Sequence, residues 1–260
     1  MKIATWNVNS IRTRLEHVIN WLSENPIDVL CLQETKVVDS NFPRSPFEEL
    51  GYHLYTSGQK AYKGVALISR EPLTDVSTGF TPILGDIEPT WDESKRVITG
   101  VNNGIRIVNL YVPNGSAVGS EKYEYKLEWL KLLLEYLRLL LSSQTTICVC
   151  GDFNIALEPE DIHEGVIAEN HIMASQAERQ ALRNILALGF ADAFLKFTTE
   201  GGHYSWWDYR AAAFRRNLGW RIDHHYLTEA LYERAVSCTI DVAPRKLPQP
   251  SDHTPVIVEF

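Results

Sequence analysis

The chain has 260 residues, 45% of them hydrophobic, which is enough for a sizeable buried core and excludes both a disordered chain and a small disulfide-stapled fold. It carries 25 Lys and Arg against 33 Asp and Glu. The net charge of −8 therefore excludes a broadly basic nucleic-acid coat but allows a local basic face beside an acidic site. The opening residues MKIATWNVNS hold no secretory signal, and charged residues interrupt the most apolar segment, 127–141, so we expect a cytoplasmic protein without a membrane span.

Short runs rich in β-branched and apolar residues recur along the chain and predict about ten strands. They lie at residues 2–8, 28–32, 53–57, 64–69, 96–101, 105–112, 146–151, 222–227, 236–242 and 255–260. Low-complexity tracts, repeats and linkers are missing from the sequence, so residues 1–260 are expected to form a single domain.

Three helical patterns lie between these runs. In 14–25, apolar residues recur at i, i+3, i+4 and i+7, and Pro26 ends the helix. A long apolar stripe predicts a helix at 121–141, and Ser175, three residues before a glutamate, is a suitable N-cap for a helix at 175–188. Strands joined partly by turns and partly by helices indicate an α/β fold in which two packed sheets are flanked by helices.

Several apolar runs end in residues that suit chemistry better than a core. Asp152 and Asn154 are two apart, so in an extended segment they point the same way. Each such residue alone could be a turn residue or a satisfied edge carboxylate, but side chains from many strand ends can converge on one rim. The set is Asn7, Gln33, Glu34, Tyr111, Asn114, Asp152, Asn154, Asp223, Asp252 and His253.

These residues predict a metal-assisted phosphoester hydrolase. Oxygen donors without paired thiolates favour Mg²⁺ or Mn²⁺ over zinc, and the candidate ligands are Asn7, Glu34, Asp152, Asn154 and Asp252. His253 is a proton carrier that Asp223 could hold in one tautomer, and Tyr111 adds a phenolic donor. Acyl chemistry is disfavoured, because the sequence has no strand-to-helix elbow that places a nucleophile beside a histidine.

A second cluster spans residues 203–223, reading HYSWWDYRAAAFRRNLGWRID. Arginines at 210, 215, 216 and 221 are interleaved with aromatic residues, and between the first and last of them there is no acid. Guanidinium groups neutralise phosphates, and flat rings stack on bases or line a pocket for an unstacked sugar. Alternatively, tryptophans such as Trp207 belong to the core and the arginines form a solvated face. Lys60 and Lys63 are a weaker basic spot, best interpreted as a solvated turn.

The remaining histidines and the cysteines are interpreted as structural. His17, His53, His163, His171, His203, His224 and His225 are expected at the surface or the core edge. Cys31, Cys148, Cys150 and Cys238 are expected as reduced thiols, because the single C-x-C lacks the second pair that a structural zinc site needs.

The motifs together resemble the exonuclease III type of apurinic/apyrimidinic (AP) endonuclease. They are WNVNSIR, DVLCLQETK, GYHLYTSGQKAYKGVALISR, NLYVPNG, GDFNIA, SWWDYR, GWRID and SDHTPV, and they span essentially the whole chain. LQETK, GDFN and SDH also occur in the wider endonuclease/exonuclease/phosphatase superfamily, which includes deoxyribonuclease I. SWWDYR followed by GWRID is more specific to the repair branch.

The resemblance implies a four-layered α/β sandwich of the deoxyribonuclease I type and Mg²⁺-dependent cleavage of DNA on the 5′ side of abasic sites. It also implies 3′-to-5′ exonuclease and 3′-phosphatase activity on double-stranded DNA with blocked 3′ ends, with Mn²⁺ as a substitute and the protein a monomer. The catalytic residues that it implies are Tyr111, Asp152, Asn154, Asp223 and His253. Its metal-site residues are Asn7, Glu34, Asp152, Asn154, Asp252 and His253, and its DNA-binding residues are Asn114, Trp206, Arg210, Trp220 and Ile222.

Three positions depart from parts of that family. Asn9 stands where some relatives have an aspartate near the metal, which makes a second metal site doubtful. Ala117 and Arg210 stand where animal-type enzymes place a DNA-penetrating arginine and a methionine wedge. These differences leave the balance of endonuclease and exonuclease activity open.

Two other functions stay open. One is a non-catalytic nucleic-acid-binding module on the same fold, which the intact set of acids, amides and histidine disfavours. The other is a superfamily phosphatase acting on inositol phosphates or lipids, which the arginine- and tryptophan-rich segment disfavours.

Overall fold

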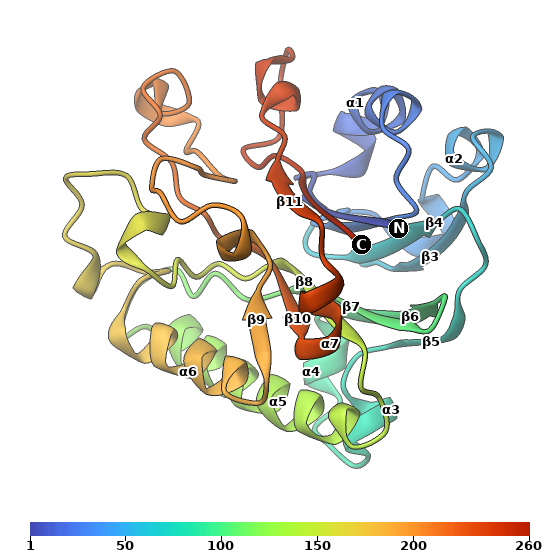
Figure 1. The fold of residues 1–260 in the computed structure, drawn as a ribbon, viewed down its shortest axis with the longest axis horizontal. Coiled ribbons are helices and arrows are strands. Elements are labelled where there is room, and N and C mark those ends of the chain that lie inside the picture. The colour runs from blue at the N-terminus through green and yellow to red at the C-terminus, as the bar shows by residue number, and fades with distance from the viewer.

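Two six-stranded sheets form the centre of the molecule in the computed structural model, which describes residues 1–260 apart from the side chain of Glu169 (Figure 1). The first sheet has the order β11 (Ser237–Ile240), β12 (Val256–Glu259), β1 (Lys2–Asn7), β2 (Val29–Gln33), β4 (Val65–Ser69), β3 (His53–Ser57). The second has the order β5 (Thr74–Thr78), β6 (Val97–Asn102), β7 (Ile105–Tyr111), β8 (Ile147–Asp152), β10 (Asp223–Thr228), β9 (Phe190–Asp192). Both sheets are mixed, with parallel pairs β1–β2 and β7–β8 at their centres.

Helices cover the outer faces of both sheets, so the four-layered sandwich is confirmed (Figure 1). On one side lie α1 (Ile11–Glu24) and α2 (Ser45–Glu49), and on the other α5 (Glu121–Leu141) and α6 (Gln176–Leu186). Short helices occur at α3 (Thr81–Leu84), α4 (Thr90–Glu93) and α7 (Glu229–Arg234). In the described part of the chain, helices long and apolar enough to cross a membrane are absent.

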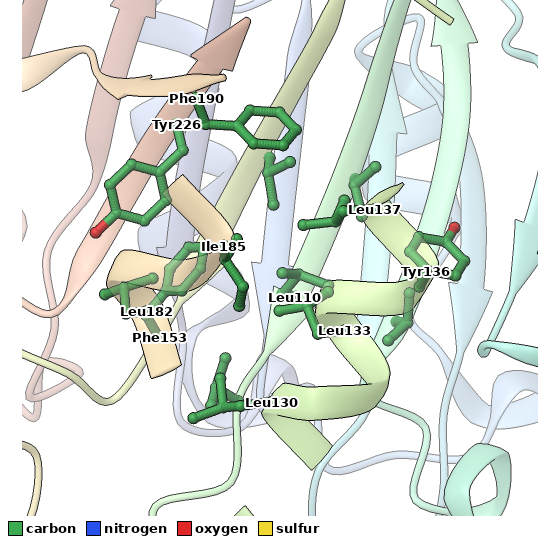
Figure 2. Packing of buried hydrophobic residues seen from close by; sticks show 14 of the residues in the cluster. Leu110, Leu130, Leu133, Tyr136, Leu137, Phe153, Leu182, Ile185, Phe190 and Tyr226 are labelled. Carbon is green, nitrogen blue, oxygen red and sulfur yellow. The ribbon is translucent and has the colours of Figure 1, made fainter. Parts of the chain in front are cut away.

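The apolar face of α5 packs on the second sheet. Leu133 and Leu137 of α5 lie in one buried cluster with Leu110 of β7, and Ile185 of α6 joins the same cluster (Figure 2). Aromatic rings extend this cluster toward the functional end of the sheet, where Phe153, directly after β8, packs edge-to-face on Tyr226. Close packing of this kind resists small displacements, which suits a sheet that must hold reactive side chains in place.

The predicted elements are mostly confirmed. The helix 121–141 has the predicted bounds, and Ser175 caps α6 through a capping box with Glu178. The first helix begins at Ile11 rather than residue 14, because Ser10 accepts a hydrogen bond from the Thr13 N–H and starts the helix earlier. Strands β5 and β9 were not predicted, since one is a largely polar edge strand and the other has three residues.

The four cysteines are free and buried, as expected. Cys31, Cys148 and Cys150 belong to the apolar cluster between the two sheets. Burial raises the pKa of the Cys148 and Cys150 thiols well above their usual value, which keeps them protonated.

The strand ends carry the candidate functional residues to one end of the sandwich. Asn7 at the end of β1 pairs with Gln33 at the end of β2, and Tyr111 at the end of β7 pairs with Asp152 at the end of β8. Asp223, the first residue of β10, lies opposite Asp152 in the antiparallel ladder. Parallel strands end at the same edge of a sheet, so the topology gathers these side chains.

Candidate active site

A cavity of about 880 Å³ lies at this end of the molecule. Ten of the predicted site residues line it: Glu34, Tyr111, Asn114, Asp152, Asn154, Trp206, Arg210, Trp220, Asp252 and His253. One part of the lining is carboxylate, amide and imidazole, and the other is largely aromatic and aliphatic. The cavity therefore combines a polar reaction centre with an apolar recess.

The carboxylate of Asp152 accepts three hydrogen bonds in the polar part. Its Oδ1 accepts the backbone N–H of Asn154 at 2.9 Å, and its Oδ2 accepts the side-chain amide of Asn7 at 2.9 Å. The Nε2 of His253 lies 3.8 Å from the same Oδ2. Burial raises the pKa of Asp152 to about 7, and the nearby negative charge of Asp223 adds to the effect against the opposing His253. Asp152 can therefore exchange a proton near neutral pH.

Asn7 joins two carboxylates through one amide group. Its Nδ2 donates to Glu34 Oε1 at 3.0 Å as well as to Asp152, while its Oδ1 accepts the N–H of Asn9 at 3.0 Å. In this arrangement Asn7 presents a donor, not an oxygen ligand, to the space between Glu34 and Asp152.

Glu34 also faces a cation. The ammonium of Lys36 lies 2.8 Å from Glu34 Oε2 and donates to Asn9 Oδ1. Burial opposes ionisation of Glu34, but Lys36 and the Asn7 amide together lower its pKa, so it is a carboxylate at neutral pH. Asn9 in turn donates to Asp252 Oδ1 at 3.0 Å, so a chain of contacts joins Glu34 to Asp252 through Lys36 and Asn9.

His253 and Asp223 form the predicted pair. Asp223 Oδ2 lies 2.8 Å from His253 Nδ1 and accepts the Ser205 hydroxyl at 2.6 Å. Burial disfavours a charged imidazole, but Asp223 and Asp152 outweigh it and raise the pKa of His253 to about 10. At neutral pH His253 is an imidazolium that Asp223 holds with Nε2 toward Asp152.

The two asparagines form a bonded pair beside Asp152. Asn114 Nδ2 donates to Asn154 Oδ1 at 3.0 Å, and Asn154 Nδ2 donates to the carbonyl of Val112 at 3.0 Å. Asn154 has a left-handed backbone, with φ of 50°, which asparagine tolerates better than most residues.

Tyr111 has a different neighbour. The guanidinium of Arg96 lies 4.5 Å from its ring centroid and donates to its carbonyl at 2.9 Å. Burial raises the pKa of Tyr111 well above its usual value, as does Glu34, so the hydroxyl stays a donor.

The apolar recess begins at Trp206. Its indole N–H donates to Asp252 Oδ2 at 3.0 Å, which ties the recess to the polar centre. Trp220 is 3% exposed and packs in a cluster with Ile162, Met173 and Ile222. Ile222 belongs to this supporting cluster without lining the cavity, so the prediction that it contacts DNA directly is not supported by its position.

Sequence interpretation missed two histidines. His163 and His171, expected at the surface or core edge, both line the cavity, and the ring of His171 lies 4.8 Å from that of Trp220. Both are isolated polar residues in irregular segments, where neither periodicity nor a motif points to the cavity.

The arginine cluster divides in two. Arg210 lines the cavity and pairs with Asp208 at 2.6 Å, and Arg215 and Arg216 are exposed. Arg221 is 2% exposed and holds Asp161 at 2.7 Å and Asp192 at 2.8 Å, so its interpretation as a phosphate contact is wrong. Trp207, also 2% exposed, is core.

The polar centre fits a hard divalent cation. Four carboxylates, from Glu34, Asp152, Asp223 and Asp252, surround it, with His253 and Lys36 as nearby cations. Within the described structure, Asp223 Oδ1 is buried and has no hydrogen-bond partner. Side-chain oxygens of Asp152 and Asp223 and a nitrogen of His253 lie within 4.8 Å of one another. Because His253 is an imidazolium at neutral pH, it has no free lone pair for a cation, and the carboxylates are the candidate ligands. Excess negative charge and an oxygen-rich donor set suit Mg²⁺ or Mn²⁺.

Comparison with known families and proteins gives one consistent answer. A family described as the endonuclease/exonuclease/phosphatase family matches residues 4–253. An exodeoxyribonuclease from Bacillus subtilis (strain 168) is 34% identical over 98% of this chain and 98% of its own length. Exodeoxyribonuclease III from Haemophilus influenzae is 32% identical over 100% of both chains.

Solved structures agree with this. An AP endonuclease from Archaeoglobus fulgidus is 43% identical with a TM-score of 0.93, covering 100% of this chain and 99% of its own. A 3′-5′ exonuclease from Neisseria meningitidis is 41% identical with a TM-score of 0.94 over 100% of this chain and 99% of its own. A 3′ phosphatase from Neisseria, solved with a product DNA hairpin, is 39% identical with a TM-score of 0.94 and the same coverage.

Proposed function

We propose that this chain is a Mg²⁺-dependent DNA-repair enzyme. The proposal starts from its family, since the chain belongs to the endonuclease/exonuclease/phosphatase family and is a phosphodiester-hydrolysing nuclease. It cleaves double-stranded DNA on the 5′ side of abasic sites and also removes nucleotides and phosphates from 3′ ends. One observation carries the proposal: a single cavity contains both the polar centre and the apolar recess. The polar centre is formed by Asp152 and His253, which Asp223 supports, and the recess by Trp206 and Trp220. We propose that the protein acts as a monomer.

In the proposed reaction, Asp152 takes a proton from the attacking water, whose oxygen bonds to phosphorus. The bond between phosphorus and the 3′ oxygen breaks, the leaving oxygen takes a proton from a solvent water, and Asp152 afterwards returns its own proton to solvent. His253, protonated and fixed by Asp223, donates from Nε2 to a phosphate oxygen, where negative charge increases in the transition state. Tyr111 provides a further donor to the phosphate. Asn154, whose amide nitrogen donates to Asp152 Oδ2 at 3.2 Å and to the carbonyl of Val112, orients Asp152.

Glu34, with Asp152 and Asp252, would hold the divalent cation, which when bound neutralises phosphate charge and polarises the phosphoryl oxygen. Asn7 orients Glu34 and Asp152 through its amide.

Glu34→Ala is expected to weaken Mn²⁺ binding by at least roughly 10–100-fold, the loss usual for removing a group that only supports a ligand, because it removes an anionic donor from the site. Calorimetric titration or Mn²⁺ electron paramagnetic resonance measures this without an activity assay. Turnover should fall strongly while the protein still folds. Glu128→Ala, on the exposed face of α5, is the control and should bind Mn²⁺ as the parent does. Unchanged Mn²⁺ affinity in Glu34→Ala would refute this metal assignment.

Trp220→Ala is expected to lower kcat/KM on an abasic duplex roughly 10–100-fold, since an aromatic contact with an unstacked nucleotide contributes about 1–3 kcal/mol. Removal of a 3′ phosphate, which needs no extruded sugar, should change less than about threefold on the same principle. Steady-state kinetics on both substrates measure the difference. Equal losses would remove the recess from the account of substrate selection.

The proposed function has one direct test. A duplex carrying a single tetrahydrofuran abasic analogue is incubated with Mg²⁺, with Mn²⁺ and with EDTA, and the product ends are resolved. Cleavage 5′ to the analogue with either metal and none with EDTA is expected. Binding of DNA without any cleavage would favour the non-catalytic module, and release of phosphate from an inositol polyphosphate with the duplex intact would favour the superfamily phosphatase.

A further inference from the structure

Lys126 is a buried charged residue that the proposed reaction does not use. It lies in the middle of the first half of α5, on the face turned toward the site, and its side chain is 0% exposed. Burying an ammonium group is unfavourable unless its donors are all satisfied. The partners of Lys126 therefore indicate what this position is for.

Three acceptors surround the ammonium. Its Nζ lies 2.5 Å from Glu178 Oε1, 2.8 Å from the carbonyl of Asn154 and 3.2 Å from the carbonyl of Asn114. The two carbonyls belong to the two asparagines that line the cavity and bond to each other through their side chains. An ammonium has three N–H donors, so this set accounts for all of them.

Glu178, the partner of Lys126, is fully buried as well and connects the pair to the wall of the cavity. Its Oε1 also accepts the N–H of Met173 at 3.1 Å, and its Oε2 accepts the N–H and the hydroxyl of Ser175 at 3.0 and 2.6 Å. Met173 lines the cavity and packs in the cluster that supports Trp220. One neutral ion pair thus fixes backbone groups from the polar centre and from the recess.

The backbone turns at Asn114 and Asn154 lie directly against Lys126. Asn154 has φ of 50°, and Gly115, which follows Asn114, has φ of 89°. A Cβ at Gly115 would lie 3.2 Å from Lys126 Cδ and 3.0 Å from Ile172 Cδ1, so the turn packs closely against both the lysine stem and the recess. Glycine and asparagine both adopt positive φ angles readily, so the two Lys126 bonds act on the orientation of the two carbonyls.

We propose that Lys126, neutralised by Glu178, is a positioning residue that sets the orientation of Asn114 and Asn154 beside Asp152 and couples them to the wall of the recess. The inference rests on the proposed role of Asn154 in the reaction. Lys126 itself is enclosed and touches no substrate.

Activity measurements test the proposal through the neutral double variant Lys126→Met with Glu178→Gln, which avoids leaving one buried charge unpaired. Its kcat on the cleaved duplex should fall roughly 10–100-fold, with KM changed less than about threefold, because small misplacements of orienting groups act on the transition state. Lys131→Met with Glu128→Gln removes an exposed ion pair from the same helix and should leave both parameters unchanged.

A double-mutant cycle separates positioning from general damage. Asn154→Gly keeps the left-handed backbone but removes the amide. If Lys126 acts through Asn154, adding the Lys126 and Glu178 changes to Asn154→Gly should cost less than about threefold, whereas adding them to Tyr111→Phe should cost the full factor. The same full loss in the Asn154→Gly background, or no loss in the parent, would overturn the proposal.

A spectroscopic readout keeps this test independent of the proposed substrate. The ¹⁵N side-chain amide resonances of Asn114 and Asn154 should shift in Lys126→Met/Glu178→Gln and stay in place in Lys131→Met/Glu128→Gln. Unshifted resonances would refute the positioning role even if the parent cleaves abasic DNA, and shifted ones would support it even if the parent prefers 3′ ends. If the double variant does not fold, Lys126→Gln/Glu178→Gln takes its place. Glutamine at position 126 is too short to reach both carbonyls, so the same outcomes are expected.

Discussion

Asp152→Asn is expected to lower kcat for phosphodiester hydrolysis roughly 10³–10⁴-fold, near the upper end of what a positioned acid or base contributes. An amide cannot take the proton of the attacking water. It also cannot accept at both positions, so one of the bonds from Asn7 and Asn154 is lost. Single-turnover cleavage of an abasic duplex at saturating metal measures the loss.

Folding should survive this substitution. Burial, with a further contribution from the negative charge of Asp223, raises the pKa of Asp152 to about 7. Replacing the carboxylate by a neutral amide therefore removes an unfavourable buried charge while it sacrifices a hydrogen bond. We expect the free energy of unfolding to change by no more than about 1 kcal/mol, the usual net contribution of one such bond. Asp86→Asn, at an exposed loop position, is the control with unchanged turnover. Activity of Asp152→Asn within tenfold of the parent would mean that another group activates water.

The position of this centre could be predicted from the sequence because strand ends carry it. Asn7 and Asp152 each close a short apolar run, and parallel pairing in each sheet brings such ends to one edge. The pairing of Asp223 with His253 required in addition that the two sheets pack with these ends together, since Asp223 begins β10 of the second sheet and His253 stands just ahead of β12 of the first. The apolar pattern of the sequence therefore predicts where the strands end, and with them the positions of these polar side chains.

Other features depend on contacts that have no local pattern. Arg221 lies close in sequence to Arg210 and to Trp220, which suggested a shared DNA surface, yet its partners Asp161 and Asp192 are 60 and 29 residues away. The stacking of His171 on Trp220 likewise depends on how an irregular segment folds over the recess. Such contacts are set by tertiary packing, which sequence spacing does not record.

The ion pair of Lys126 and Glu178 is another contact that sequence spacing does not predict. From the sequence, a lysine within the apolar pattern of α5 would be expected at the edge of the apolar face with its ammonium in solvent. The structure instead buries Lys126 beside Glu178. The sequence predicts the capping box of Ser175 and Glu178, but it indicates only that a helix starts there. The second role of Glu178, balancing a buried ammonium behind the active site, emerges from packing.

Asp223→Asn is expected to reduce kcat at pH 8 roughly 10²–10⁴-fold, the range for a displaced general acid or base, with a smaller loss at pH 6. In the parent, Asp223 and Asp152 raise the pKa of His253 to about 10, so the imidazolium persists throughout the neutral range. Removing the Asp223 charge lowers that pKa, and the proton is then lost as the pH rises through a lower value. The alkaline limb of the kcat profile should therefore move to lower pH, and rates measured at saturating metal across the pH range detect the shift.

The direction of that shift distinguishes a charged His253 from a neutral one. If His253 acted as an unprotonated base, lowering its pKa would leave more of the active form at neutral pH, and the profile would extend on its acidic side instead. The control is His253→Ala, in which the added Asp223→Asn change should cost less than about threefold, because Asp223 acts through the imidazole that it holds at 2.8 Å. An unmoved alkaline limb in Asp223→Asn would show that the imidazolium does not carry the transition-state charge, leaving that role to the bound cation and to the Tyr111 hydroxyl.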